Sequence, residues 1–189
     1  MVTSRPMRAD AVRNRRKILE AAERQISTQG PDTGMDEIAV AAGVAVGTLY
    51  RHFPTKADLV AAVIAQYVSE VADDAEASLA RAREQTSAVD EVVGFLARVA
   101  ESAAHNHAVK TAARGMGIEG HGDESDEARA GAALAQLLEL GQQAGDLRPG
   151  VTVDDIYILM ATAPADQPAP VRKRWLDLML PGITVRDVS

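Results

Sequence analysis

Hydrogen-bonding side chains are concentrated at residues 46–56, in the string Val-Gly-Thr-Leu-Tyr-Arg-His-Phe-Pro-Thr-Lys. Hydroxyl, imidazole, guanidinium and ammonium groups are interspersed there with apolar side chains. Such groups donate hydrogen bonds to phosphate oxygens, and these contacts fix the register of a protein on a nucleic acid. Arg51 can also donate two parallel hydrogen bonds to O6 and N7 of guanine, which would read a base. The stretch therefore has the chemistry of a nucleic-acid contact.

Each position near this string has a physical interpretation. Gly47 has no side chain, so the backbone there can approach a nucleic acid closely. Ala45 and Val46 present methyl groups that fit thymine methyls. Lys56 adds a positive charge where the free N–H groups at a helix start already favour an anion. The groups suited to phosphate oxygens are those of Thr48, Tyr50 and His52. For the last two, packing beneath the helix is the alternative.

A helix-turn-helix is the element that would present these residues. Ala39, Gly43 and Leu49 have its spacing, in which a small residue, a turn glycine and an apolar residue let two short helices pack closely. Gly43 would supply the positive φ of the turn. The second helix would enter the major groove of DNA, which is wide enough to admit it. The core shared with the preceding helix would consist of Ile38, Val44, Leu49 and Phe53.

Apolar residues recur at three- and four-residue spacing along most of the chain, which predicts helices almost everywhere. No alternation typical of strands, no hairpin signal and no internal repeat is present. Only 3% of residues are aromatic, which also favours closely packed helices over sheets. We therefore expect an all-α fold. The predicted helices cover residues 9–29, 35–42, 46–52, 56 into the low eighties, a segment from about 87, then 108–114, 126–144, 153–163 and 171–180.

Charge is distributed unevenly in the 189 residues. The net charge is -7, which argues against a protein that wraps polyanions without specificity. However, residues 1–60 hold nine Lys and Arg against seven Asp and Glu, a net of +2. The first seventeen residues alone carry +5, and residues 61–189 carry -9. The basic segment thus directly precedes the helix-turn-helix pattern.

Several other classes of protein are disfavoured. The sequence has no cysteine, which excludes disulfides, thiolate zinc sites and cysteine nucleophiles. His105 and His107 are two residues apart, so on a helix they diverge by about 200° and cannot easily share a metal. No Ser-His-Asp or nucleophile-elbow pattern is present. We expect no metal, no cofactor and no enzymatic activity.

The N-terminal segment is polar, unlike a secretory signal. The longest strongly apolar stretch, residues 156–163, is far shorter than the roughly 20 residues that span a bilayer. The sequence therefore predicts a cytoplasmic protein without a membrane partner.

Residues 10–60 closely resemble the N-terminal DNA-binding domain of the TetR family of bacterial transcription regulators. The string Gly-Thr-Leu-Tyr-x-His-Phe-x-x-Lys-x-x-Leu, which begins at Gly47, carries the resemblance. Beyond it only the number and order of helices match. The resemblance implies a phosphate contact at Thr33, at the entry to the second helix. Asp36 departs from it, and either favours the helix N-terminus or accepts from a cytosine amino group.

The resemblance also implies a domain organisation. It consists of a basic arm at residues 1–9, a three-helix DNA-binding domain at 10–55, and a helical domain at 56–189 that begins with a long helix. In the family, this last domain binds a small ligand and dimerises. Mostly apolar side chains of the predicted bundle could line the ligand cavity, although each is also a plausible core residue. The candidates are Tyr67, Phe95, Met116, Leu134, Leu138 and Met160.

Two C-terminal segments are candidates for a dimer interface. Residues 156–160 are apolar nearly all round the helix, so one face would have no use in a monomer. Together with the last helix they could form a four-helix contact between two copies. The candidate interface residues are Ile156, Leu159, Trp175, Leu178 and Met179.

These patterns predict a homodimeric transcription regulator, with a repressor favoured. It would bind a palindromic operator in double-stranded DNA and be released by a small-molecule effector of unknown identity. One alternative is an all-helical interaction protein that binds DNA only without sequence specificity. A small all-α enzyme is a weaker alternative, because no set of titratable side chains converges in the sequence pattern.

Overall fold

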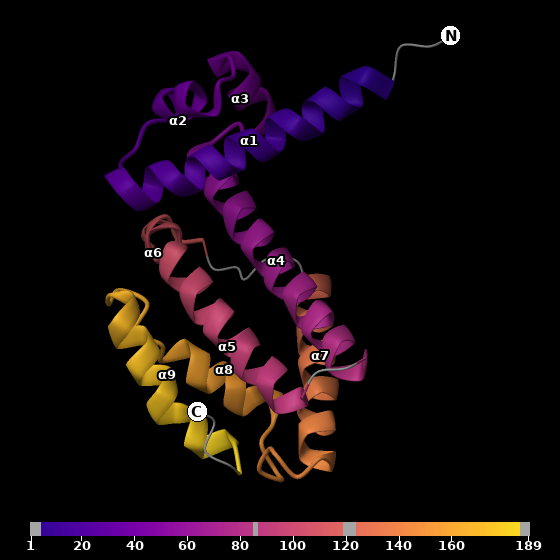
Figure 1. Ribbon diagram of the computed structural model, residues 1–189. Coiled ribbons are helices and arrows are strands. Elements are labelled where there is room, and N and C mark those ends of the chain that lie inside the picture. Colours follow the sequence, from indigo (N-terminus) through magenta and orange to yellow (C-terminus); the bar gives the residue numbers. More distant parts are fainter. Residues whose placement is uncertain (1–4, 85–86, 119–123, 186–189) are drawn as a thin grey trace. The chain divides into compact units, whose positions relative to one another are not determined.

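The computed structural model describes residues 5–84, 87–118 and 124–185, and these fold into helices without a strand (Figure 1). The all-α prediction is confirmed. Helix boundaries agree with the sequence pattern to within a few residues, except that the first helix starts at Arg5 rather than near Ala9. The helices are α1 (Arg5–Gln29), α2 (Met35–Ala42), α3 (Val46–His52), α4 (Lys56–Glu84), α5 (Ala88–His105), α6 (His107–Gly115), α7 (Glu124–Gln143), α8 (Val153–Ala161) and α9 (Ala169–Ile183).

The chain divides into two compact units. The first consists of Met1–Tyr67 and Asn106–Gly122, and the second of Val68–His105 and Asp123–Ser189. The first unit therefore contains α6 as well as α1, α2 and α3, and α6 packs against α1. The long helix α4 contributes residues to both units. The sequence-based boundaries at residues 10, 55 and 56 remain predictions.

Packing of α5, α7, α8 and α9 with the second half of α4 forms the core of the second unit. Their apolar residues recur once per helical turn, so each helix buries one stripe against the others. The stripes meet in a single hydrophobic cluster. Its largest members include Leu79, Val92, Phe95, Leu96, Leu134, Leu137, Leu138, Ile156, Leu176 and Leu180.

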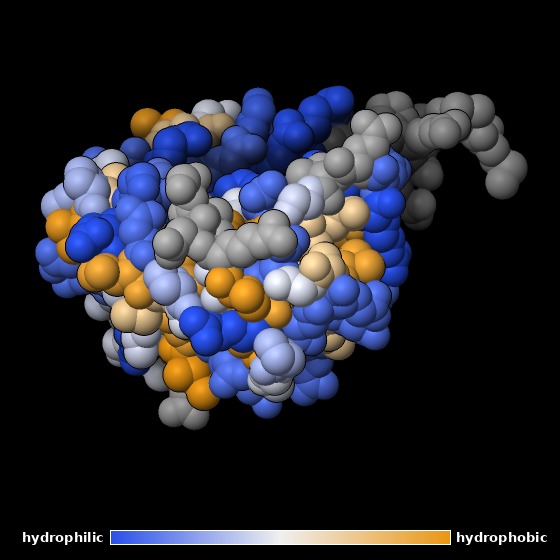
Figure 2. Space-filling view, turned by 60° about the horizontal axis from the view of Figure 1, so that its bottom comes forward, coloured by the Kyte–Doolittle hydropathy of each residue, from blue (hydrophilic) through white to orange (hydrophobic). Residues whose placement is uncertain are grey.

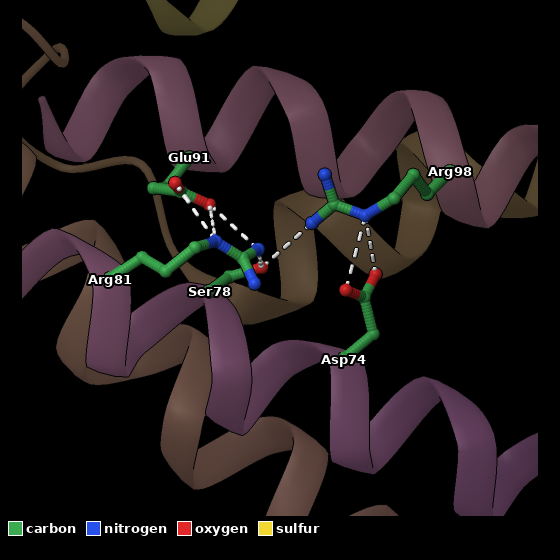
Figure 3. Close-up of polar contacts among 5 residues, drawn as sticks. All are labelled: Asp74, Ser78, Arg81, Glu91 and Arg98. Atoms are coloured by element: carbon green, nitrogen blue, oxygen red, sulfur yellow. Dashed lines mark hydrogen bonds and ion pairs between the residues drawn. The ribbon is translucent and has the colours of Figure 1, made fainter. Parts of the chain in front are cut away.

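Charged side chains fix α4 to α5 beside this core (Figure 3). The guanidinium of Arg81 donates to both carboxylate oxygens of Glu91, at 3.1 and 3.0 Å from Nε, and that of Arg98 pairs with Asp74 at 2.9 Å. Ser78 is fully buried between them, and its hydroxyl oxygen accepts from Nη2 of both arginines, at 3.0 and 2.8 Å. One buried hydroxyl thus links two ion pairs, which ties the two helices together at neighbouring turns.

Two further arginines link helices within the second unit. Arg129 of α7 pairs with Asp73 and Glu76 of α4, each at 2.7 Å, and its guanidinium lowers the pKa of Glu76. Arg172 of α9 pairs with Glu101 of α5 and lowers the pKa of that carboxyl. Each ion pair thus joins segments far apart in the sequence.

Gly141 in α7 permits the close approach of the loop that follows. A Cβ atom there would lie 2.5 Å from Cδ1 and 2.7 Å from Cγ of Leu147, which is itself fully buried. Gly141→Ala is therefore expected to reduce the free energy of unfolding by about 1–3 kcal/mol, as overpacking does in cores. Chemical denaturation followed by circular dichroism measures the change.

Gly131→Ala in the same helix is the matched control. Its Cβ would meet only the phenol oxygen of Tyr157, at 3.3 Å, and that half-exposed side chain can move. Because alanine is favoured over glycine inside helices by about 1 kcal/mol, the control should be neutral or stabilising. Equal destabilisation by both substitutions would contradict the role assigned to Gly141.

Candidate nucleic-acid interface

The turn between α2 and α3 is built around Gly43. This residue has φ 66° and ψ 35°, in the left-handed region that glycine adopts without strain. The chain reverses there, and the N–H of Val44 donates to the carbonyl of Ala39 at 3.1 Å. Ala39 is fully buried, as close packing of two helices requires. The turn predicted from the spacing is confirmed.

The apolar residues of this motif hold α3 in place. Ile38 of α2, Leu49 of α3 and Phe53 at the end of α3 are all buried, as predicted. Val44 is only half-buried. Because α2 and α3 both pack on α1, the orientation of α3 is set by the core of the first unit.

One face of α3 is left to solvent. Val46, Gly47, Tyr50 and Arg51 are exposed and span about 140° of the helix circumference, on the side away from Leu49. Ala45, which precedes the helix, is exposed as well. Thr48 and His52 lie between this face and the buried Leu49 and are half-buried, so their side chains have a share in packing. The exposed face of α3 combines one strong cation, a phenol and small apolar groups.

Gly47 is not required by packing within the protein. A Cβ atom built at this position would meet no atom within 4 Å, and its backbone is helical. A helix-forming residue would therefore stabilise the isolated protein. The absence of a side chain leaves this part of α3 open to close approach from outside.

Thr33 has a contact within the protein, and its phosphate contact remains a prediction. Its side chain is buried, and its hydroxyl donates to the carbonyl oxygen of Gly30 at 2.8 Å. In this arrangement the single hydroxyl proton is engaged by a backbone carbonyl. Thr33 thereby stabilises the turn that follows α1. Asp36, in the first turn of α2, is exposed.

Lys56 has a structural contact besides its predicted one. Its ammonium donates to the carbonyl oxygen of Pro31, which ties the start of α4 to the segment after α1. The group has three N–H donors, so two remain for other acceptors. Lys56 thus lies at a fixed position a few residues beyond α3.

Arg15 of α1 was not singled out by the sequence. Its guanidinium carbon lies 5.6 Å from the centroid of the Phe53 ring, which in turn lies 6.2 Å from the His52 ring. Its neighbours Arg13 and Arg16 instead pair with Asp10 and Glu20 on the exposed surface of the helix. The stacked Arg15 therefore braces the end of α3.

The six predicted pocket residues belong to different units. Phe95, Leu134 and Leu138 lie together in the core of the second unit, and Met160 packs against them. Tyr67 is buried in the first unit, which also contains the exposed Met116. Four of the six candidates thus belong to one hydrophobic cluster, and a role for them in holding a ligand remains a prediction.

The predicted dimer residues differ widely in exposure. Ile156 is 1% exposed and packs in the core of its own unit, so its assignment to an interface is wrong. Leu159 and Trp175 are half-buried, whereas Leu178 and Met179 are exposed. Tyr157 and Ile158, which belong to the predicted segment 156–160 but not to the candidate residues, are exposed at 49% and 67%. The space-filling view shows apolar patches separated by polar side chains on the face that it draws (Figure 2).

Other kinds of site find no support in the residues that the structure describes. His105 ends α5 and His107 begins α6, and no group of three or more possible metal ligands occurs there. Among these residues, no helix has the length and apolar character needed to cross a bilayer.

Comparison with known proteins covers both units. Residues 18–63 match the family model described as bacterial regulatory proteins, tetR family, and residues 89–185 match that of the SbtR-like transcriptional regulator C-terminal domain. A TetR transcription regulatory protein from Mycobacterium vanbaalenii is 34% identical with a TM-score of 0.74, and the alignment covers 95% of this chain and all of that one. For a TetR transcriptional regulator from Streptomyces coelicolor the values are 29% and 0.70, over 90% and 98% of the two chains.

Curated relatives match over a shorter length. HTH-type transcriptional regulators of Staphylococcus aureus are 44% identical over 54 residues. This segment is 28% of the present chain and 29% of theirs. The similarity to these relatives is thus confined to about the length of one small domain.

Proposed function

Since the chain belongs to the TetR family of bacterial transcription regulators, we propose that it is a repressor that binds a palindromic operator and leaves it when a small effector binds. Its family consists of regulators rather than enzymes. The observation that carries the proposal is the solvent-exposed face of α3, held by the Gly43 turn and the buried Leu49. Because operators are chromosomal, the proposal places the protein in the cytoplasm.

A palindromic operator follows from a two-fold dimer. TetR-family regulators act as dimers, and in this chain apolar side chains on α8 and α9 are exposed, among them Ile158, Leu178 and Met179. Burying them against a second copy would remove apolar surface from water. Two copies of α3 related by a two-fold axis would read two half-sites about one helical turn apart.

Release by an effector requires a difference in affinity between two conformations. An effector that binds better to the state whose two α3 helices do not match the operator spacing shifts the population to that state. Ligand sites often lie between helices, and the predicted pocket residues Phe95 and Leu138 belong to the apolar core of the second unit. The effector must therefore distinguish the two states and not merely bind.

Selection of bound sequences from a random duplex pool tests the proposal. A repressor of this kind enriches a palindrome, and its affinity for that sequence exceeds its non-specific affinity by a factor on the order of 10³ or more. The competing function, DNA binding without specificity, gives strongly salt-dependent affinity with no enriched sequence. Failure to enrich any sequence would reject the operator and leave the competing function.

Arg51→Ala is expected to weaken operator binding by about 1–3 kcal/mol and to relax specificity at one base pair of each half-site. The reason is the loss of a bidentate donor on the exposed face of α3. Fluorescence anisotropy on operators substituted one pair at a time measures both effects.

Arg24→Ala, an exposed arginine of α1, is the charge-matched control and should leave the base preferences intact. Uniform weakening by Arg51→Ala over all sequences would instead place Arg51 on a phosphate.

A further inference from the structure

Helix α6 carries positive charge without a carboxylate. Its nine residues include His107, Lys110 and Arg114 and no Asp or Glu. These three positions fall on one side of the helix, within about 60° of its circumference. Val109 and Ala112 are buried on other sides. The helix therefore presents a basic face within the first unit.

Lys110 lies against an aromatic ring. Its ammonium nitrogen is 4.2 Å from the centroid of the Tyr67 ring, and the side chain is half-buried. Burial lowers the pKa of Lys110, and the nearby charge of Arg114 lowers it further. Burial raises the pKa of Tyr67, so the ring supplies its face and a neutral hydroxyl but no negative charge. Among the residues that the structure describes, the Tyr67 ring is thus the partner of this cation, and it stabilises the charge much less than a carboxylate would.

The charges of α6 contrast with those of the second unit. There Arg81, Arg98, Arg129 and Arg172 each pair with a carboxylate, while Arg83 donates to Gln136 and Arg148 to backbone carbonyls. In the described part of the chain, no carboxylate pairs with Lys110 or Arg114, although acidic residues outnumber basic ones by 27 to 20 in the sequence. A half-buried cation next to another cation is costly unless an anion accompanies it.

We propose that the basic face of α6 is a binding site for a small organic acid, whose carboxylate contacts Lys110 and Arg114. An arginine fork can donate two hydrogen bonds to a carboxylate, and the lysine adds a third. The rigid backbone of a duplex suits exposed cations better than one packed on a ring, which favours a small ligand over DNA. Because α6 packs against α1, an anion bound here acts within the unit that holds α3. As a statement about the effector, this inference rests on the proposed function.

The lysines of the chain make a direct test possible. The sequence has only four, at positions 17, 56, 110 and 173, so their ζ groups give few NMR signals that single Lys→Arg variants assign. The full chain is titrated with benzoate, with its neutral isostere benzamide and with inorganic phosphate, at constant ionic strength. Benzoate is expected to raise the pKa of Lys110 by about 1 unit and to shift its signal saturably, while benzamide has no effect. Lys173, which pairs with Asp177, is the internal control.

Four outcomes decide the matter. Saturable benzoate binding that is lost in Lys110→Met and weakened in Arg114→Gln supports the inference. A response to phosphate alone shows that an inorganic oxyanion is the ligand, which overturns the proposal of an organic acid. A Lys110 signal that moves no more than that of Lys173 overturns it as well. The inference is also overturned if duplex DNA shifts the Lys110 signal and Lys110→Met reduces the salt dependence of DNA binding. The operator selection is run without organic anions, so its failure is separate from these results.

Discussion

Leu49→Ala is expected to unfold the first compact unit and to abolish DNA binding. The side chain of Leu49 is 0% exposed and packs between α3 and the helices beneath it. Truncation of a buried leucine costs about 2–5 kcal/mol, because apolar contacts are lost and a cavity remains. That is a large part of the total stability of a small unit, which is of the order of 5–15 kcal/mol. Hydrogen exchange would show loss of protection in α1, α2 and α3.

Tyr50→Ala tests the contact of α3 with DNA separately from the folding of the first unit. Tyr50 is the next residue, but it is 45% exposed on the outer face of α3. Its truncation should weaken operator binding while the thermal unfolding temperature changes little. If both variants lower the unfolding temperature equally, Tyr50 is packed in the core as Leu49 is, and α3 does not present it to solvent. If Leu49→Ala binds the operator with wild-type affinity, the motif does not present α3 to DNA.

Arg81→Met is expected to destabilise the second unit by about 1–3 kcal/mol. The carboxylate of Glu91 has only 10% of its side-chain surface exposed, so removal of the guanidinium leaves a nearly buried charge without its partner. The cost is smaller than the 3–5 kcal/mol found for fully buried pairs, because the side chain of Arg81 is 44% exposed. Ser78 also loses one of its two donors (Figure 3).

Substitution of the carboxylate partner should destabilise the second unit less than Arg81→Met does. In Glu91→Leu, the arginine can turn to water and the new side chain is apolar, next to the core of α5. The double variant should regain most of the stability lost in Arg81→Met, since no unpaired charge remains. Chemical denaturation of the four proteins gives the coupling energy. Additive losses would show that the pair is not coupled, and a larger loss for Glu91→Leu than for Arg81→Met would contradict the explanation from burial.

The local parts of the structure could be predicted from sequence. Gly43 and Leu49 were identified because a turn and a buried stripe depend on neighbours a few residues away, which the sequence displays. The hydrogen bond from the Thr33 hydroxyl to the carbonyl of Gly30 was not predicted, because it depends on the path of the chain after α1. Ile156 was wrong because a helix that is apolar all round does not reveal which side faces its own core.

Contacts between distant segments could not be predicted from the sequence patterns. The contacts of Arg15 with Phe53 and of Lys110 with Tyr67 join residues about forty positions apart in the sequence. In the sequence alone, each cation is indistinguishable from an ordinary surface charge. Placement of α6 in the same unit as α1 likewise depends on tertiary packing. A signal was present for α6, since a helix with two cations and no acid is unusual in an acidic protein.

The length of α3 limits how much sequence information it can extract from DNA. Its seven residues extend about 10 Å, which corresponds to about three base pairs. Two copies in the proposed homodimer would specify roughly six pairs, a combination that recurs about once in 4,000, whereas genomes offer on the order of 10⁶ or more competing positions. The missing discrimination must come from half-site spacing, from DNA that bends easily and from contacts outside α3. An operator for this protein is therefore defined by several features together, and α3 recognises only some of them.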